Sequence, residues 1–187
     1  LAQLHGVYIL AQSLEGLVIV DMHAANERIL YERLKLAYSD QGVPSQNLLI
    51  PLECNVPSEH VDYVNEHGLL LLQLGFELKV IAPTKISILA RPSILKLNNI
   101  VSLVEDVLSE LCLFKSSDGA KKAFNKVLAT MSCHDAIRAN RILSKQEMNS
   151  LLRQIEQTQG SDYCNHGRPT WFLWDMKKLD KIFHRGE

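Results

Sequence analysis

The amino-acid sequence predicts an α+β protein of two lobes, and the order of its elements carries that prediction. Two apolar runs and a helical segment open the chain, a helix–hairpin–helix block fills its middle, and further helices and a loop motif close it. The middle block differs in pattern from both ends, which indicates an insertion. We therefore predict one mixed α/β lobe from residues 1–51 and 130–187, with an inserted α/β lobe over residues 52–129.

Length, composition and charge narrow the class of protein. The chain has 187 residues, 47% hydrophobic and 22% charged, so it can bury a sizeable core and is not dominated by disorder. Its most apolar stretch, Gly68–Phe76, is far shorter than the roughly 20 residues of a membrane-spanning helix, and we see no signal peptide. Because the chain opens on a leucine, we expect a domain of something longer. The net charge of −1 implies that DNA, if bound, is held mainly elsewhere.

The first lobe is expected to begin with a pair of strands. Val7–Leu10 and Leu17–Val20 flank a turn at residues 15–16, and the second run is apolar enough to be buried on both faces. Helical composition and spacing follow over His23–Tyr38. Gly42 and Pro44 end the helix, and a strand is expected over Leu48–Val56.

The inserted block and the C-terminal part of the chain contain residues that are typical of helix starts, turns and helix ends. We predict one helix beginning at residues 57–59 and ending at Gly75. The elements predicted after it are a hairpin of Phe76–Ile81 and Lys85–Leu89, helices at Asn99–Phe114, Gly119–Met131 and Ser144–Gln157, and a loop from Gln159 to Thr170.

Three short segments carry side chains of the kinds that bind metals. They are Asp21–Glu27, where a strand passes into a helix, Ser132–His134 at a helix end, and Cys164–His166 in a loop. His23 and Glu27 are four residues apart and project from one helix face. Zinc takes sulfur, nitrogen and oxygen ligands, whereas Mn²⁺ and Mg²⁺ prefer carboxylates. Two neighbouring divalent ions are a usual arrangement for phosphodiester hydrolysis.

Taken singly, most of these residues also have a purely structural explanation. Asp21 fits a helix cap, and His23 with Glu27 fits a solvated pair on a helix surface. Cys133, like Cys54 and Cys112, fits a buried free thiol; without a secretory pattern, disulfides are not expected. The pair Cys164–His166 is harder to explain this way, because it lies among turn residues. Spacing alone leaves the metal site and the structural explanations open.

A family resemblance decides between these explanations. The segment DMHAANERILYE, residues 21–32, resembles the D-Q-H-A-x-x-E-x-x-x-x-E motif of the MutL family of DNA mismatch-repair proteins. CNHGRPT, residues 164–170, resembles the family's C-P-H-G-R-P motif, and Ser132–His134 falls where its A-C-(R/K) motif belongs. The order of the three motifs resembles the C-terminal domain of bacterial MutL proteins of the endonuclease-bearing kind.

The resemblance implies a dimerisation and endonuclease lobe built from both chain ends and an inserted regulatory lobe. By position, Asp21 matches the aspartate needed for nicking, and with Glu27 it would hold a catalytic Mn²⁺ or Mg²⁺. A structural or regulatory Zn²⁺ would be held among His23, Glu27, Cys133, Cys164 and His166. Glu32 matches the last glutamate of the first motif, whose role is less defined.

The chain departs from the family motifs without losing a proposed ligand. Met22 stands in place of Gln, Ser132 and His134 in place of Ala and Arg/Lys, and Asn165 in place of Pro. Met22 is expected to affect the orientation or hydration of the site, and His134 is expected to be a surface charge rather than a ligand. Arg168 has two roles open to it, a DNA phosphate contact or a carboxylate contact that pins the loop, and we favour the second.

A fourth segment resembles a docking peptide. Gln46–Pro51, QNLLIP, resembles the Q-x-(apolar)-(apolar)-x-P peptide with which MutL endonucleases engage the replication sliding clamp. Extended apolar peptides bind grooves in this way. The contacts would come from Gln46, Leu49, Ile50 and Pro51. The alternative is a buried strand that joins the lobes.

Together these observations predict a metal-dependent DNA-nicking endonuclease and homodimerisation domain of a mismatch-repair protein. The alternative is a non-catalytic dimerisation and partner-docking module with a structural zinc. The resemblance implies a second copy of the chain, DNA delivered mainly by an N-terminal ATPase region, the sliding clamp and MutS as partners. It also implies a cytoplasmic, nucleoid-associated protein without a membrane segment.

Overall fold

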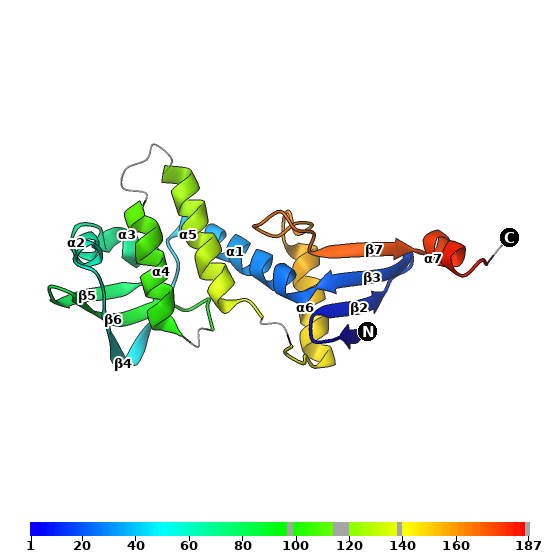
Figure 1. The fold of residues 1–187 in the computed structure, drawn as a ribbon, viewed down its shortest axis with the longest axis horizontal. Helices are drawn as coiled ribbons and strands as arrows, with labels where there is room; N and C mark the ends of the chain where they lie inside the picture. The colour runs from blue at the N-terminus through cyan, green and yellow to red at the C-terminus, as the bar shows by residue number, and fades with distance from the viewer. Residues whose placement is uncertain (97–98, 114–119, 138–139, 186–187) are drawn as a thin grey trace. The chain divides into compact units, whose positions relative to one another are not determined.

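The computed structural model describes residues 1–96, 99–113, 120–137 and 140–185. Over this part the chain is mixed α+β, with seven helices and two antiparallel sheets, which confirms the α+β part of the predicted fold class (Figure 1). It divides into two compact units: unit 1 is Leu1–Ile29 with Ala136–Glu187, and unit 2 is Leu30–Asp135. The predicted lobe boundaries at residues 52 and 129 stay a prediction. No described helix combines the length and apolar character needed to span a membrane.

Unit 1 contains a four-stranded sheet made from both ends of the chain. Its strands lie in the order β1 (Ala2–Leu4), β2 (Tyr8–Gln12), β3 (Gly16–Asp21) and β7 (Trp171–Asp175), and every neighbouring pair is antiparallel. β2 and β3 were predicted, whereas β1 and β7 were not. β1 is three residues long, and β7 gains its ladder from β3, far away in the sequence. The C-terminal segment thus forms one edge of the sheet.

One face of this sheet packs on helix α6 (Lys145–Gln157), as Figure 1 shows. Ser144 caps the helix in a capping box: its hydroxyl accepts from Glu147 N at 3.2 Å, and the Glu147 carboxylate accepts from Ser144 N at 2.8 Å. The apolar side chains of α6 and of the sheet then form one core, which contains Ile9, Val20, Met22, Met148, Leu151 and Ile155.

Helix α1 (Met22–Asp40) follows β3 without a connecting loop, in agreement with the predicted helix over His23–Tyr38. Its first residues belong to unit 1 and its remainder to unit 2. The metal-type side chains of the first motif therefore stand on the first two turns of a helix that leaves a buried strand.

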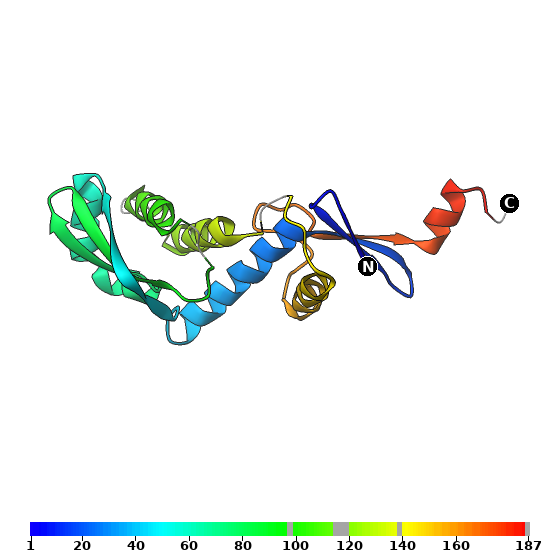
Figure 2. The same cartoon turned by 90° about the horizontal axis from the view of Figure 1, so that it is seen from below.

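Unit 2 is built on a three-stranded antiparallel sheet in the order β4 (Ser45–Asn55), β6 (Lys85–Pro92) and β5 (Glu77–Ala82). β5 and β6 form the predicted hairpin (Figure 2). The central strand β6 buries Ile86, Ile88 and Ala90 on one face, as the period-two alternation of a strand requires. Residues of α2 (Ser58–Glu66), α3 (Gly68–Gln73), α4 (Ile100–Leu113) and α5 (Ala120–Asp135) share that core.

The structure corrects three predictions about helices. The single helix expected up to Gly75 is two helices, because His67 leaves the helical conformation between α2 and α3 (φ −123°, ψ 27°). α5 continues past the predicted end at Met131 to Asp135. Helix α7 (Met176–Ile182) was not predicted. The predicted helix ends at Phe114 and Gly119 lie outside the described residues.

Candidate metal centre

The candidate centre begins where β3 passes into α1. The Asp21 carboxylate oxygen Oδ1 accepts hydrogen bonds from the backbone N–H groups of His23 and Ala24, each at 3.0 Å. These bonds satisfy donors that the first turn of a helix leaves without intrahelical partners, so the capping role of Asp21 is confirmed. The cap uses only Oδ1. The same carboxylate therefore retains Oδ2 for another ligand.

Glu27 lies one turn further along α1 and is almost fully buried, with 1% of its surface exposed. Its carboxylate oxygen Oε1 lies 3.1 Å from His166 Nε2, and Asn165 Nδ2 donates to the same oxygen at 3.4 Å. The alternative of a solvated surface pair is therefore wrong for Glu27. A buried carboxylate is costly unless it is paired and hydrogen-bonded, and here the third motif supplies both partners.

The loop that carries the third motif is fastened by its own backbone. Cys164 N donates to Arg168 O at 2.8 Å, and Gly167 N donates to Cys164 O at 3.0 Å. Gly167 has φ +76°, a conformation that glycine adopts without strain. Cys164 is consequently buried at 3% exposure.

Thr170 ties this loop to the β3 end of the sheet. Its carbonyl oxygen accepts from Asp21 N at 2.9 Å, and its buried hydroxyl donates to Ser161 O. The structure thus brings the Asp21 backbone and the third-motif loop together. The favoured pinning of the loop by Arg168 is not observed, because the exposed Arg168 side chain contacts no carboxylate in the described part of the chain.

His23 is oriented by a residue that the sequence did not single out. Its Nδ1 atom lies 2.9 Å from Ile137 O, and the Asn26 side-chain oxygen accepts from Ile137 N at 2.9 Å. If Nδ1 carries the proton, Nε2 keeps a lone pair that can bind a metal. Asn26 lies at an unspecified position of the family motif, so no spacing rule pointed to it.

The second motif lies at the end of α5, in unit 2. Cys133 is exposed, so its interpretation as a buried core thiol is wrong. His134 Nε2 lies 2.7 Å from Asp106 Oδ2 on α4, and its expected role as a surface charge stays a prediction. Cys54 is buried and Cys112 half-buried, both against the core of unit 2, and none of the four cysteines is in a disulfide.

The side chains in unit 1 fit a divalent ion in chemistry and in one pair distance. Two ligands of a tetrahedral zinc ion, each bound at about 2.0–2.1 Å, are separated by about 3.3 Å, close to the 3.1 Å between Glu27 Oε1 and His166 Nε2. Across the described residues, no group of three or more His, Cys, Asp or Glu side chains is arranged to hold an ion. The fit therefore rests on the donor types and on this one pair.

The segment that resembles a clamp-binding peptide protrudes from strand β4. Asn47 pairs with Ala90 and Leu52 with Ile88, so residues 48–51 bulge opposite a single residue of β6. Leu49 is 103% exposed and Ile50 77% exposed. Arg91 Nη2 donates to the side-chain oxygen of Gln46 at 3.1 Å and holds the start of the segment. The alternative of a buried connecting strand is wrong for these side chains.

The unit 1 sheet has a second, open face. Side chains alternate along each strand, so the face opposite Ile9 and Val20 belongs to the residues between them. Their cross-strand partners share that face: Ile19 pairs with Leu10 and Phe172, and Leu17 pairs with Trp174. Phe172 is 51% exposed on the edge strand. Exposed apolar surface of this kind marks an interaction site.

Comparisons with known proteins agree with the motifs. Residues 1–143 match the family model described as the MutL C terminal dimerisation domain. The DNA mismatch repair protein MutL of Pseudomonas syringae pv. tomato is 48% identical over 187 residues, which are 100% of this chain and 29% of that protein. The proteins of the same name from Pseudomonas fluorescens and Azotobacter vinelandii are each 48% identical over 186 residues, with the same coverage. The chain thus spans 29% of the length of these relatives. It belongs to the family of MutL C-terminal dimerisation domains.

Proposed function

We propose that this chain is the metal-dependent DNA-nicking endonuclease and homodimerisation domain of a MutL mismatch-repair protein. One observation carries the nicking activity: Glu27 of the first motif is buried against His166 and Asn165 of the third. A backbone hydrogen bond from Asp21 N to Thr170 O also joins the first motif to the end of the third. Two of the three motifs therefore meet through direct contacts.

The residues of the centre would divide between a catalytic and a structural ion, with Glu27 common to both. Asp21 and Glu27 would hold a Mn²⁺ or Mg²⁺ ion, which supplies an activated water and stabilises the leaving oxygen of a phosphodiester. A structural or regulatory Zn²⁺ would be held among His23, Glu27, Cys164 and His166 of unit 1, while the assignment of Cys133 as a further ligand stays a prediction from the sequence. Asn165, which replaces the proline of the family motif, donates to Glu27 and helps hold its carboxylate.

The open sheet face supports homodimerisation. Two copies that cover each other's apolar face would remove exposed aromatic side chains such as Phe172 and Trp174 from water. Sheets pack face to face at about 10 Å, with their side chains interdigitated. MutS and an N-terminal ATPase region that delivers the DNA belong to the proposal for the whole protein.

Nicking of supercoiled plasmid in Mn²⁺ at low salt tests the catalytic assignment. We expect Asp21→Asn to reduce nicking to the level seen without metal. Asparagine caps helices as well as aspartate does, so this variant keeps α1 intact. Asp62→Asn, an exposed change on α2, is the matched control and should nick like the wild type.

Two results would decide against an enzyme centred on Asp21. Equal nicking by wild type and Asp21→Asn would show that the centre is elsewhere. A zinc-loaded dimer that fails to nick, also with its ATPase region and the clamp present, would support the alternative of a non-catalytic docking module.

A second function, docking to the sliding clamp, is favoured by the protruding tip of β4. The exposed Leu49 and Ile50 are available to enter a groove on a partner. We expect Leu49→Ala/Ile50→Ala to weaken binding to the purified clamp at least about tenfold, because a few anchor side chains supply most of the binding energy of such contacts. Leu69→Ala/Leu72→Ala on α3 removes the same kind of exposed side chains and should leave clamp binding unchanged.

A further inference from the structure

We propose that helix α7 and the residue Arg185 form a binding surface for the phosphate backbone of duplex DNA. We call this surface the α7 basic patch; it consists of Lys177, Lys178, Lys181 and Arg185. The proposal rests on the proposed function in one respect, namely that DNA is the ligand.

The patch is a local excess of positive charge in a nearly neutral chain. The chain as a whole has a net charge of −1. Between Asp175 and Arg185, the four basic residues of the patch stand beside two acidic residues, Asp175 and Asp180, which leaves a local excess of two positive charges. Phosphate neutralisation by lysine and arginine supplies most of the sequence-independent affinity for DNA. A nearly neutral chain that binds DNA needs such a local excess.

The helix places its basic side chains on one side. Successive residues of an α-helix are rotated by about 100°, so Lys177, Lys178 and Lys181 fall within an arc of about 100°. The apolar residues Met176 and Leu179 lie on the other side of the helix. The lysines therefore form a stripe rather than a scattered set.

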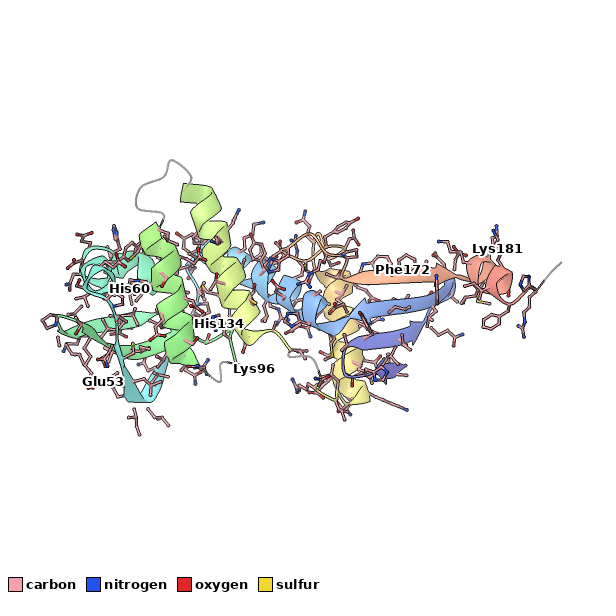
Figure 3. All side chains as sticks on the ribbon, viewed as in Figure 1. Glu53, His60, Lys96, His134, Phe172 and Lys181 are labelled. Carbon is pink, nitrogen blue, oxygen red and sulfur yellow. The ribbon has the colours of Figure 1, made fainter. Side chains whose placement is uncertain are left out.

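The lysines of the stripe are exposed, and one of them, Lys178, is held by Asp175. Lys178 Nζ lies 3.3 Å from Asp175 Oδ2 and 5.8 Å from the centre of the Phe172 ring. Asp175 also caps the helix by accepting from Lys178 N at 2.8 Å. Lys177 and Lys181 are exposed, and the ion pair of the Asp175 carboxylate is made with Lys178. Figure 3 shows Lys181 at the outer end of the helix.

Strand β7 connects the patch to the candidate metal centre. It begins just after the loop that carries His166 and Arg168 and ends where α7 starts. Its five residues span about 17 Å, which equals about five base-pair steps of B-DNA. Arg168 and the α7 basic patch therefore flank β7, Arg168 before the strand and the patch after it.

Fluorescence anisotropy with a labelled 30-base-pair duplex tests the patch. The 187-residue chain is titrated without added Mn²⁺ or Mg²⁺, so that nicking does not contribute, at KCl concentrations from 50 to 200 mM. We expect Lys177→Gln/Lys181→Gln to weaken binding on the order of tenfold and to reduce the slope of log K against log[KCl] by about 2. The matched control Lys79→Gln/Lys145→Gln removes the same charge from exposed positions and should bind like the wild type.

Several results would overturn the proposal. They are an unchanged slope in the patch variant, equal losses in both double variants, and no salt-dependent binding by the wild type. A loss of dimerisation in the patch variant, measured by sedimentation velocity, would make the patch part of the dimer. Loss of binding to phosphatidylglycerol vesicles with DNA binding intact would make it a lipid site.

Different measurements test the α7 basic patch and the proposed nicking activity, so the failure of one proposal is distinguishable from the failure of the other. Asp21→Asn tests nicking and leaves the patch untouched. If Asp21→Asn loses nicking while the patch variant binds DNA like the wild type, the patch is wrong and the proposed function stands. If the patch variant loses DNA binding while Asp21→Asn still nicks, the proposed catalytic centre is wrong and the patch stands.

Discussion

A carboxylate oxygen of Glu27 lies 3.1 Å from Nε2 of His166, which joins the first helix of the chain to a loop near its end. Glu27 is buried whereas the His166 side chain is half exposed, so the pair forms the inner part of the candidate centre. Asn165, which donates a hydrogen bond to Glu27, and His166, which would share an ion with Glu27, therefore come from the same loop.

Replacing Glu27 should remove metal from the protein. We expect Glu27→Gln to lower the affinity for Zn²⁺ at least about tenfold, because even residues that only support a ligand have effects of 10–100-fold. Metal content after dialysis, measured by mass spectrometry, checks this result. Glu156→Gln, an exposed change on α6, should retain the zinc content of the wild type. Wild-type zinc in the Glu27 variant would remove this residue from the ligand set.

A charge on the open sheet face should separate the proposed dimer. Phe172 lies opposite Ile19 on that face, and Phe172→Glu would place a carboxylate between the two copies. We expect the dimer dissociation constant to rise on the order of 100-fold, as at other central aromatic contacts. Sedimentation velocity measures this shift, and Leu36→Glu on the exposed side of α1 is the control. An unchanged dissociation constant would place the interface elsewhere.

Acid should destabilise unit 2 through His60 on α2, which Figure 3 labels. Burial lowers the pKa of His60, and this effect exceeds the opposite effect of the negative charges of Glu59 and Glu105, which raise the pKa. The buried Nδ1 atom of His60 has no hydrogen-bond partner among the described residues. The unfolded chain then binds the proton more readily than the folded one. Stability therefore falls as the pH drops through about 6.5 and on to the folded-state pKa, by about 1.4 kcal/mol per unit between the two pKa values.

Urea unfolding at pH 7.5 and pH 5.5 measures this loss. We expect His60→Phe to reduce the difference in unfolding free energy between the two pH values, whereas His5→Asn, at an exposed position, should not. An undiminished difference in the His60 variant would assign the acid sensitivity to other groups.

The capping box of α6 should contribute measurably to unit 1. Ser144→Ala removes the oxygen that accepts from Glu147 N, so we expect the unfolding free energy to fall by about 1 kcal/mol. Ser144→Asp should restore most of it, because aspartate also caps helices. Ser109→Ala on α4, whose hydroxyl bonds only to the preceding turn, is the control for loss of a hydroxyl. The midpoint of urea unfolding distinguishes the three variants.

Elements with strong local patterns could be predicted from the sequence. The turn before Leu17, the helix that starts at Ser144 and the helix-ending Gly75 each depend on residues within a few positions of one another. Strand β7 and helix α7 could not be predicted in this way. β7 is a strand because Val20 and Val18 pair with Trp171 and Leu173, and that ladder joins the two ends of the chain.

Some features of the candidate site could likewise be predicted from the sequence, and others could not. Its donor types and motif order are visible in the sequence, and so is the capping role of Asp21. The contact of Asn26 with Ile137 and the bulge that exposes Leu49 are not, because both depend on how distant segments pair.

By itself, the sequence determined the α+β class, the family, and which side chains are available to bind a metal, because periodicity and side-chain chemistry are local properties. Only the tertiary structure decided that Glu27 is buried against His166, that Cys164 is buried while Cys133 is exposed, and that the lysines of α7 follow an edge strand. The physical reason is that burial and contact depend on strand register and loop closure between residues far apart in the chain.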